Sequence, residues 1–262
     1  MYTLEILARR LRLGSQTMAY PRGPAPSLPD RHGGALRLDS ARCTPGCTAC
    51  ADVCPTAAIQ VGATTVLDQG RCLFCGACHE QCGTGAIQPT GDHRLAVRHL
   101  ADLRIGGDYG AELRRAEAMG SELRSLLGRS LKLRQVSAGG CNACEADLNV
   151  LGTIGWDLGR FGIQFVASPR HADGLVLTGP VTDNMRLGLE KTWAAIPGPK
   201  IAIAVGACAL SGGPYGSQTA GLHGAPGTDI PFDLYIAGCP PHPLTILEGI
   251  LRLLGKVPGI DT

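Results

Sequence analysis

Short apolar runs alternate with amphipathic stretches throughout the second half of the chain. Strand-like runs occur in "LKLRQVSAG", "DGLVLTGPVT", "KIAIAVGACAL" and "FDLYIAGCPP". Helix-like stretches occur among them in "NMRLGLEKTWAAI" and "HPLTILEGILRLLG". Short buried strands that alternate with helices are typical of a parallel sheet. The pattern therefore predicts a parallel α/β domain over residues 131–262.

The N-terminal segment has a different pattern. Leu4, Leu7 and Leu11 share one face at helical spacing, and neighbouring arginines add positive charge. Glycine and proline signals follow in "RLGSQTMAYP". We therefore predict an amphipathic helix and an extended arm over residues 1–34. Two interpretations stay open, since the helix can dock on a protein partner or rest on a membrane subunit or anionic lipid headgroups.

A charged stretch without cysteine, "AELRRAEAMGSELRSLLGRS", lies within residues 94–130. Its composition favours helix. We predict a helical linker between two modules, with the charges on a solvated face.

Composition narrows the class of protein. The chain has 262 residues, of which 44% are hydrophobic and 18% charged, as in ordered globular proteins of one or two domains. The net charge of +2 gives no support for a nucleic-acid partner. Neither a signal peptide nor an apolar run long enough to span a membrane is present. We therefore expect a reducing cytosolic environment, where twelve cysteines indicate metal binding rather than disulfides.

Eight cysteines form an internal repeat, in the blocks "CTPGCTACADVCP" and "CLFCGACHEQCG". Three thiolates at short gaps can reach three irons of one cubane cluster, while the fourth points away. In the bacterial two-cluster pattern that fourth cysteine binds the other cluster. The expected ligand sets are Cys43, Cys47, Cys50 and Cys82 for the first cluster, and Cys72, Cys75, Cys78 and Cys54 for the second. The alternative is a pair of zinc sites, which usually have paired C-x-x-C knuckles and need no third nearby cysteine.

These blocks resemble two-[4Fe–4S] ferredoxin domains over residues 35–93. This sequence departs from that pattern in having three residues between Cys43 and Cys47, which can alter the first binding loop, and Gly83 where proline is usual. Together with the N-terminal segment, the blocks resemble the two-cluster ferredoxin-like subunit of respiratory complex I and formate hydrogenlyases. That resemblance implies an arm that lies along the membrane part of a complex.

The remaining cysteines are Cys141, Cys144, Cys208 and Cys239. Three of them lie just beyond predicted strands, and Cys144 lies about one turn further on. Sites on parallel sheets gather at the carboxyl ends of the strands, so all four are expected at one edge. Glycines around the later cysteines let backbone N–H groups approach cluster sulfurs. A phosphate loop is excluded, because no G-x-x-x-x-G-K-[ST] or G-x-G-x-x-G motif follows a strand.

Several motifs then occur in a family order: "GGCNACEAD", "RFGIQFVASPRHADGLVLTGPVT", "VGACALSGGPYG" and "DLYIAGCPPHP". They resemble the small subunit of group 4 membrane-bound [NiFe] hydrogenases, which is related to the 20-kDa subunit of complex I. The complex I subunit has adjacent cysteines at the first position, whereas two residues separate Cys141 and Cys144 here. The resemblance implies that Cys141, Cys144, Cys208 and Cys239 hold a third [4Fe–4S] cluster.

Other polar residues are weaker candidates. Glu145 is a candidate for proton transfer; the alternative is that it caps the following helix or pairs with an arginine. Arg170 and His171 are expected at an interface or sheet edge. His242 invites a metal-ligand role, but a full cysteine set lies nearby. No Ser/His/Asp arrangement is defensible.

The chain as a whole is therefore expected to contain an α+β ferredoxin-like domain followed by an α/β flavodoxin-like parallel-sheet domain. The resemblances imply an electron-transfer subunit of a group 4 [NiFe] hydrogenase or formate hydrogenlyase-like complex with three [4Fe–4S] clusters. Its expected partners are a [NiFe] hydrogenase-type or complex I 49-kDa-like large subunit, integral-membrane subunits and an electron donor or acceptor. Its expected place is peripheral, on the cytoplasmic side of the membrane.

Catalysis is expected in the partners, because the twelve cysteines are all assigned and no flavin, NAD or molybdopterin motif is present. Two alternatives stay open. One is a complex I-like quinone-reducing or nickel-free hydrogenase-related complex, and the other is a non-catalytic, metal-stabilised scaffold of a membrane complex.

Overall fold

A six-stranded sheet forms the larger part of the fold. The computed structural model describes residues 2–216 and 222–257. The strand order is β5-β13-β11-β9-β7-β8, with every pairing parallel except that of β5. The strands are β5 (Ala96–Val97), β13 (Leu234–Ile236), β11 (Ile201–Val205), β9 (Gly174–Thr178), β7 (Leu131–Ser137) and β8 (Ile163–Phe165). The prediction of a mixed α/β chain with a mainly parallel sheet is confirmed.

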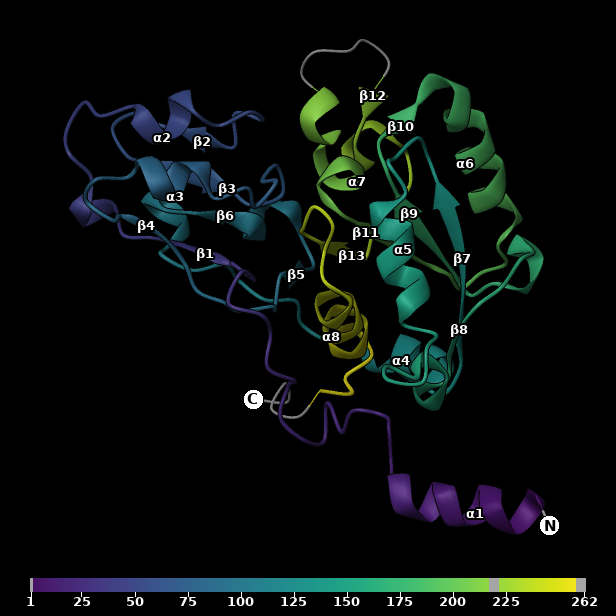
Figure 1. The fold of residues 1–262 in the computed structure, drawn as a ribbon. Helices are drawn as coiled ribbons and strands as arrows, with labels where there is room; N and C mark the ends of the chain where they lie inside the picture. The colour runs from purple at the N-terminus through teal and green to yellow at the C-terminus, as the bar shows by residue number, and fades with distance from the viewer. Residues whose placement is uncertain (1, 217–221, 258–262) are drawn as a thin grey trace.

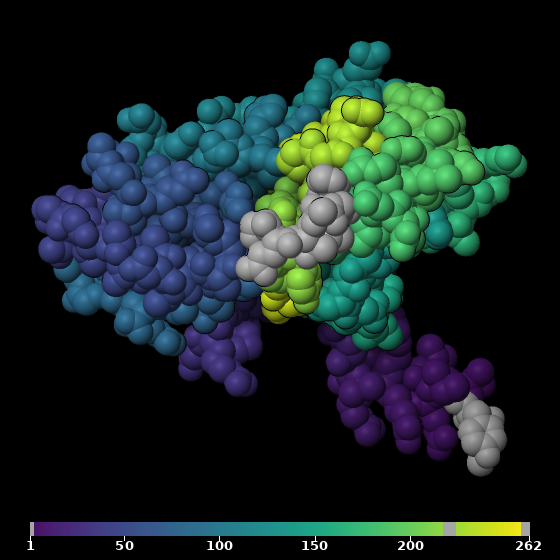
Figure 2. Space-filling view, turned by 90° about the horizontal axis from the view of Figure 1, so that it is seen from above, coloured from purple at the N-terminus to yellow at the C-terminus, as the bar shows by residue number. Residues whose placement is uncertain are grey.

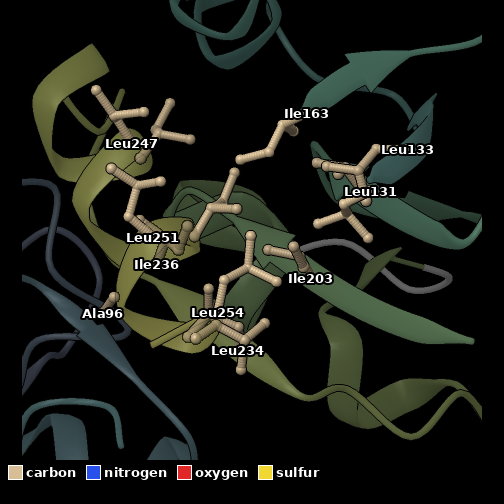
Figure 3. Close-up of a cluster of buried hydrophobic side chains, with 14 of the residues drawn as sticks. Ala96, Leu131, Leu133, Ile163, Ile203, Leu234, Ile236, Leu247, Leu251 and Leu254 are labelled. Atoms are coloured by element: carbon tan, nitrogen blue, oxygen red, sulfur yellow. The ribbon is translucent and has the colours of Figure 1, made fainter. Parts of the chain in front are cut away.

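Helices cover both faces of this sheet (Figure 1). They are α4 (Ser121–Leu127), α5 (Ala143–Val150), α6 (Asp183–Ala195), α7 (Ala207–Ser211) and α8 (Pro243–Leu253). Alternate residues of β11 enter two different cores, because successive strand side chains point to opposite faces. Ile203 packs with Leu148 of α5 and Leu251 of α8, in the core shown in Figure 3. Ala204 packs with Leu189 of α6 on the other face.

A smaller module precedes the large sheet. Its strands form two antiparallel sheets, β1 (Leu36–Leu38) with β4 (Ile87–Pro89), and β2 (Ile59–Gln60) with β3 (Val66–Asp68) and β6 (Arg104–Ile105). Two short helices, α2 (Ala49–Asp52) and α3 (Ala77–Gln81), pack on each other. The pair β10 (Val181–Thr182) and β12 (Leu222–His223) forms a further small sheet. Short 3-10 helices span Ser40–Arg42, Leu100–Leu103, Gly107–Tyr109, Leu158–Phe161, Pro169–His171, Gly213–Tyr215 and Ala225–Gly227.

The helical linker predicted over residues 94–130 is wrong for most of its length. Only α4 is an α-helix there. The preceding residues are extended because their backbone bonds to the large module. Ala116 N–H donates to Ala96 O at 2.7 Å and Met119 N–H to Leu253 O at 2.9 Å. Both side chains are buried, so tertiary contacts override the helical preference of the sequence.

The segment over residues 96–105 belongs to both modules. Its first part, β5, pairs antiparallel with β13 of the large sheet, and its last part, β6, pairs with β3 of the small sheet. Between them, Leu103 is completely buried. The modules lie side by side (Figure 2). A strand pairing at each end leaves this connection little freedom, so the two modules are held at a fixed separation.

The N-terminal helix α1 (Tyr2–Leu13) stands away from the body of the protein (Figure 1). The predicted helix is confirmed, and Leu4, Leu7 and Leu11 are all exposed on it. The arm that follows is anchored, because Arg160 donates to Met18 O at 2.6 Å and to Tyr20 O at 2.7 Å. Within the described residues, no helix is both long enough and apolar enough to cross a membrane.

We predict that Leu103→Ala destabilises the whole chain by about 2–5 kcal/mol, the cost of a cavity at a fully buried leucine. Denaturant unfolding should give one transition, with circular dichroism and the fluorescence of the two tryptophans, both in the large module, coinciding. Leu126→Ala is the control, because Leu126 is 57% exposed, and it should cost no more than about 0.5 kcal/mol. Two separated transitions would show that the modules are not held together by this segment.

Candidate metal centres

The first site is a cavity of about 170 Å³ in the small module. All four cysteines of the first expected set, Cys43, Cys47, Cys50 and Cys82, line it. The rest of its wall includes Leu38 and Ile87, which are almost fully buried. A compact apolar cavity lined by thiols has the donor set that an iron–sulfur cluster requires.

The second site is a cavity of about 380 Å³ lined by Cys54, Cys72, Cys75 and Cys78. Cys54 belongs to the first sequence block, and Cys82, in the first site, belongs to the second block. The fold thus exchanges the last cysteine of each block between the two cavities, as the spacing predicts.

The two exchanged cysteines have matching surroundings. The backbone N–H of Ala58 donates to Cys54 Sγ at 3.2 Å, and that of Ala86 donates to Cys82 Sγ at 3.2 Å. A threonine hydroxyl also lies near each sulfur, Thr56 Oγ1 at 3.7 Å and Thr84 Oγ1 at 3.6 Å. Hydrogen bonds of this kind stabilise negative charge on sulfur and raise a cluster's potential. Neither threonine was among the residues predicted from the sequence, although each lies two residues after the last cysteine of its repeat.

Burial is the main cause of the raised pKa values of two buried thiols at the second site, Cys72 and Cys78. It raises the pKa of Cys72 to about 12 and that of Cys78 to about 11, and neighbouring cysteines add to both shifts. Burial also favours a higher pKa at Cys82, but hydrogen bonds from Ile87, Thr84 and Ala86 outweigh it and lower that pKa to about 7. Because iron binds the thiolate, loading of the buried thiols must release protons.

The third site gathers four cysteines at the carboxyl edge of the large sheet. Cys141 follows β7, Cys144 lies in the first turn of α5, Cys208 lies in α7 directly after β11, and Cys239 follows β13. Neighbouring cysteines in this set raise one another's pKa values, because two thiolates close together repel each other. Burial raises the pKa of Cys144 to about 12, and Glu145, Cys208, Cys239 and Cys141 raise it further. The structure therefore brings the predicted set together.

Gly206 keeps space open at this third site. It has φ +91°, which favours glycine, and a Cβ added there would lie 2.5 Å from Cys144 Sγ. A side chain at this position would therefore displace the sulfur. Gly206 lies between the end of β11 and the start of α7, so the strand can end close to the Cys144 thiol.

Glu145 is buried at 6% exposure, and the hydroxyl of Thr178 donates to its Oε1 at 2.7 Å. The structure thus gives it a threonine partner at the end of β9, where the sequence suggested a helix cap or an arginine. His242 caps α8, because its Nδ1 accepts from Leu244 N–H at 3.1 Å. Arg170 and His171 lie exposed in a 3-10 helix.

A single metal ion is a poor match for these sites. Sulfur ligands of one zinc ion each lie about 2.3 Å from the metal and therefore crowd together. Among residues 2–216 and 222–257, no group of three or more His, Cys, Asp or Glu could hold such an ion. At the first and second sites, the thiols instead surround cavities.

These features place the protein in the class of iron–sulfur subunits of oxidoreductase complexes. The family described as "NADH ubiquinone oxidoreductase, 20 Kd subunit" matches residues 141–253, and the "4Fe-4S binding domain" matches residues 65–88. The chain belongs to the first of these families, since it also covers most of a family relative at well over 30% identity. The second match supports binding of [4Fe–4S] clusters.

Named relatives come from two kinds of complex. The probable membrane-bound hydrogenase subunit mbhJ of Pyrococcus furiosus is 37% identical over 56% of this chain and 87% of its own length. Formate hydrogenlyase subunit 7 of Escherichia coli is 41% identical over 53% of this chain, which spans about half, 54%, of that subunit. An NADH-quinone oxidoreductase subunit of Heliobacterium modesticaldum is 37% identical over 46% of this chain and 69% of its own length.

We predict that Gly206→Ala lowers the bound iron by about four atoms per chain, the content of one [4Fe–4S] cluster. The added Cβ would displace Cys144 Sγ, while the small module would be untouched. Gly188→Ala is the control, since Gly188 lies in α6 with no atom within 4 Å of an added Cβ. Iron analysis of both purified variants checks this, and full iron in Gly206→Ala would contradict it.

Proposed function

We propose that the chain is a three-cluster electron-transfer subunit of a membrane-bound group 4 [NiFe] hydrogenase or formate hydrogenlyase-like complex. It relays electrons to or from the [NiFe] centre of a partner large subunit. The observation that carries the proposal is the division of twelve cysteines into three sets of four, each set gathered at its own site. A scaffold would not need three such sites in one chain.

The proposed ligands are Cys43, Cys47, Cys50 and Cys82 for the first cluster, Cys54, Cys72, Cys75 and Cys78 for the second, and Cys141, Cys144, Cys208 and Cys239 for the third. On this proposal, residues 35–93 are a ferredoxin-like domain and residues 131–262 a flavodoxin-like domain. Residues 1–34 form the docking arm. Residues 94–130 are the connection, which contains α4 and is not an α-helix over the rest of its length.

The second site is the inner of the two sites in the small module. Arg71, directly before Cys72, and Leu210, two residues after Cys208, line one cavity of about 310 Å³ at the seam between the modules. Phe74, between Cys72 and Cys75, packs against the cores of both modules. We therefore propose the electron route as first site, second site, third site, or the reverse.

The bound clusters supply one-electron chemistry. The chain's own residues bury Cys72 and Cys78 at the second site and stabilise negative charge on sulfur through N–H donors. Glu145, buried beside Cys144 and bonded to Thr178, is placed to hold or release a proton at its carboxylate next to a partner's active site. That role is proposed and is separate from the electron route.

Exposure suggests where the partners dock. Cys141 and Cys239 are exposed at the third site, where we place the large subunit, whether of the [NiFe] hydrogenase type or of the complex I 49-kDa type. Cys47 is exposed at the first site, where we place the electron donor or acceptor. The exposed apolar face of α1 suits integral-membrane subunits. The chain would then lie peripherally on the cytoplasmic side of the membrane.

The relatives include quinone-reducing complexes, so a complex I-like or nickel-free hydrogenase-related complex is the second candidate. The two-residue gap between Cys141 and Cys144 favours the hydrogenase side. The large subunit decides between them, because nickel requires two C-x-x-C pairs. We predict that the large subunit which co-purifies with this chain carries both pairs, as sequencing would show. Absence of both would exclude hydrogen chemistry.

We predict that the anaerobically purified chain is brown, absorbs broadly near 400 nm and contains about twelve iron atoms (four per cluster). Replacing one cysteine from each set by serine, in Cys47→Ser, Cys75→Ser and Cys141→Ser, should alter a different electron paramagnetic resonance (EPR) signal in each variant. Colourless, zinc-rich protein would contradict the electron-transfer role and favour the scaffold. The same signal changing in all three variants would contradict the ligand sets.

A further inference from the structure

The arm between α1 and β1 runs past the second site. Asp30, Arg31, Gly33 and Gly34 all line the cavity that holds Cys54, Cys72, Cys75 and Cys78. His32, in the middle of this stretch, packs its ring against His242 of the large module, with ring centroids 5.5 Å apart and an interplanar angle of 70°. The arm, which the family resemblance places along the membrane part of a complex, therefore also joins the second site to the large module.

His242 belongs to the loop of the third site. It follows Cys239 after only Pro240 and Pro241, and proline rings restrict the backbone between them. Its ring is held on two further sides. Nδ1 accepts from Leu244 N–H at 3.1 Å, and Trp156 packs edge-on with centroids 5.8 Å apart. The ring against which His32 packs is thus fixed relative to a proposed cluster ligand.

The Nε2 atom of His32 does not explain the position of this residue. Its Nε2 is buried and has no hydrogen-bond partner among the described residues. Burial also lowers the pKa of His32, which keeps the ring neutral at neutral pH. The relevant feature of His32 is therefore its flat, neutral ring, which fills the space between the arm and the Cys239 loop.

We propose that His32 is a positioning residue for electron transfer between the second and third sites. Its contact with His242 holds the arm against the Cys239 loop and keeps water out of the gap between these two sites. One electron leaves one site and enters the other, and no proton or atom moves with it. The inference rests on the proposed function, since it needs clusters at both sites.

Three variants separate this role from a general structural one. His32→Ala removes the ring, and His32→Phe keeps a flat ring without nitrogen. His171→Ala is the control, because His171 lies exposed in a 3-10 helix of the large module. His32→Gln, of similar length but without a ring, replaces His32→Ala if that variant accumulates poorly.

The first readout is independent of electron transfer. Trypsin cleavage after Arg31, followed by mass spectrometry of the full cluster-loaded chain, reports whether the arm is held. We expect faster cleavage in His32→Ala, and wild-type cleavage in His32→Phe and His171→Ala. Wild-type cleavage in His32→Ala would show that the contact does not hold the arm and would overturn the proposal.

The second readout follows electrons directly. A pulse that delivers less than one electron per chain, then freezing at increasing times, lets EPR follow how the electron redistributes between the small-module signals and the third-site signal. We expect His32→Ala to lose the fast phase at unchanged iron content, and His32→Phe and His171→Ala to keep it. A wild-type fast phase in His32→Ala would overturn the inference alone. Absence of the cluster signals from the wild type would instead overturn the proposed function, and the inference with it.

Discussion

The pairing of β5 with β13 is the contact on which the rest of the architecture depends. Tyr235 pairs with Val97 and Ile236 with Ala96, at the edge of the large sheet. Eight residues after Ala96 the same segment pairs with β3 of the small sheet. Electron transfer between sites requires a short, fixed gap, and a strand shared in this way helps to fix that gap. Fusion of the two modules therefore acts as a geometric constraint as much as a covalent link.

The three sites place different demands on the chain. The small module is too small to bury a large core, and its few apolar residues surround the two thiol-lined cavities. Bound clusters would contribute to its stability, as metals do in other small modules. The third site instead lies on a sheet whose central strands, β9 and β11, are fully buried. We therefore expect the large module to depend less on its cluster for folding than the small one does.

The structural features that depend on local sequence pattern could be predicted from the sequence. The buried strands of the large sheet, α6, α8 and the four-cysteine sets all follow from periodicity or spacing, and the structure brings each set together. The sequence could not predict β5, because two residues within a charged stretch carry no strand signal and pair only in the presence of β13. The same holds for residues 111–120, where burial of Ala116 and Met119 overrides helical preference. The contact between His32 and His242 joins residues far apart in sequence, and only the fold reveals it.

The central claim is that one rigid chain holds three [4Fe–4S] clusters in a row. Anomalous X-ray scattering from crystals of the anaerobic protein at the iron edge tests it most directly. The account predicts three iron peaks, one within each set of four sulfurs, with the Cys54, Cys72, Cys75 and Cys78 peak between the other two. Fewer than three iron peaks, a zinc signal at any of the sites, or a different order would contradict it.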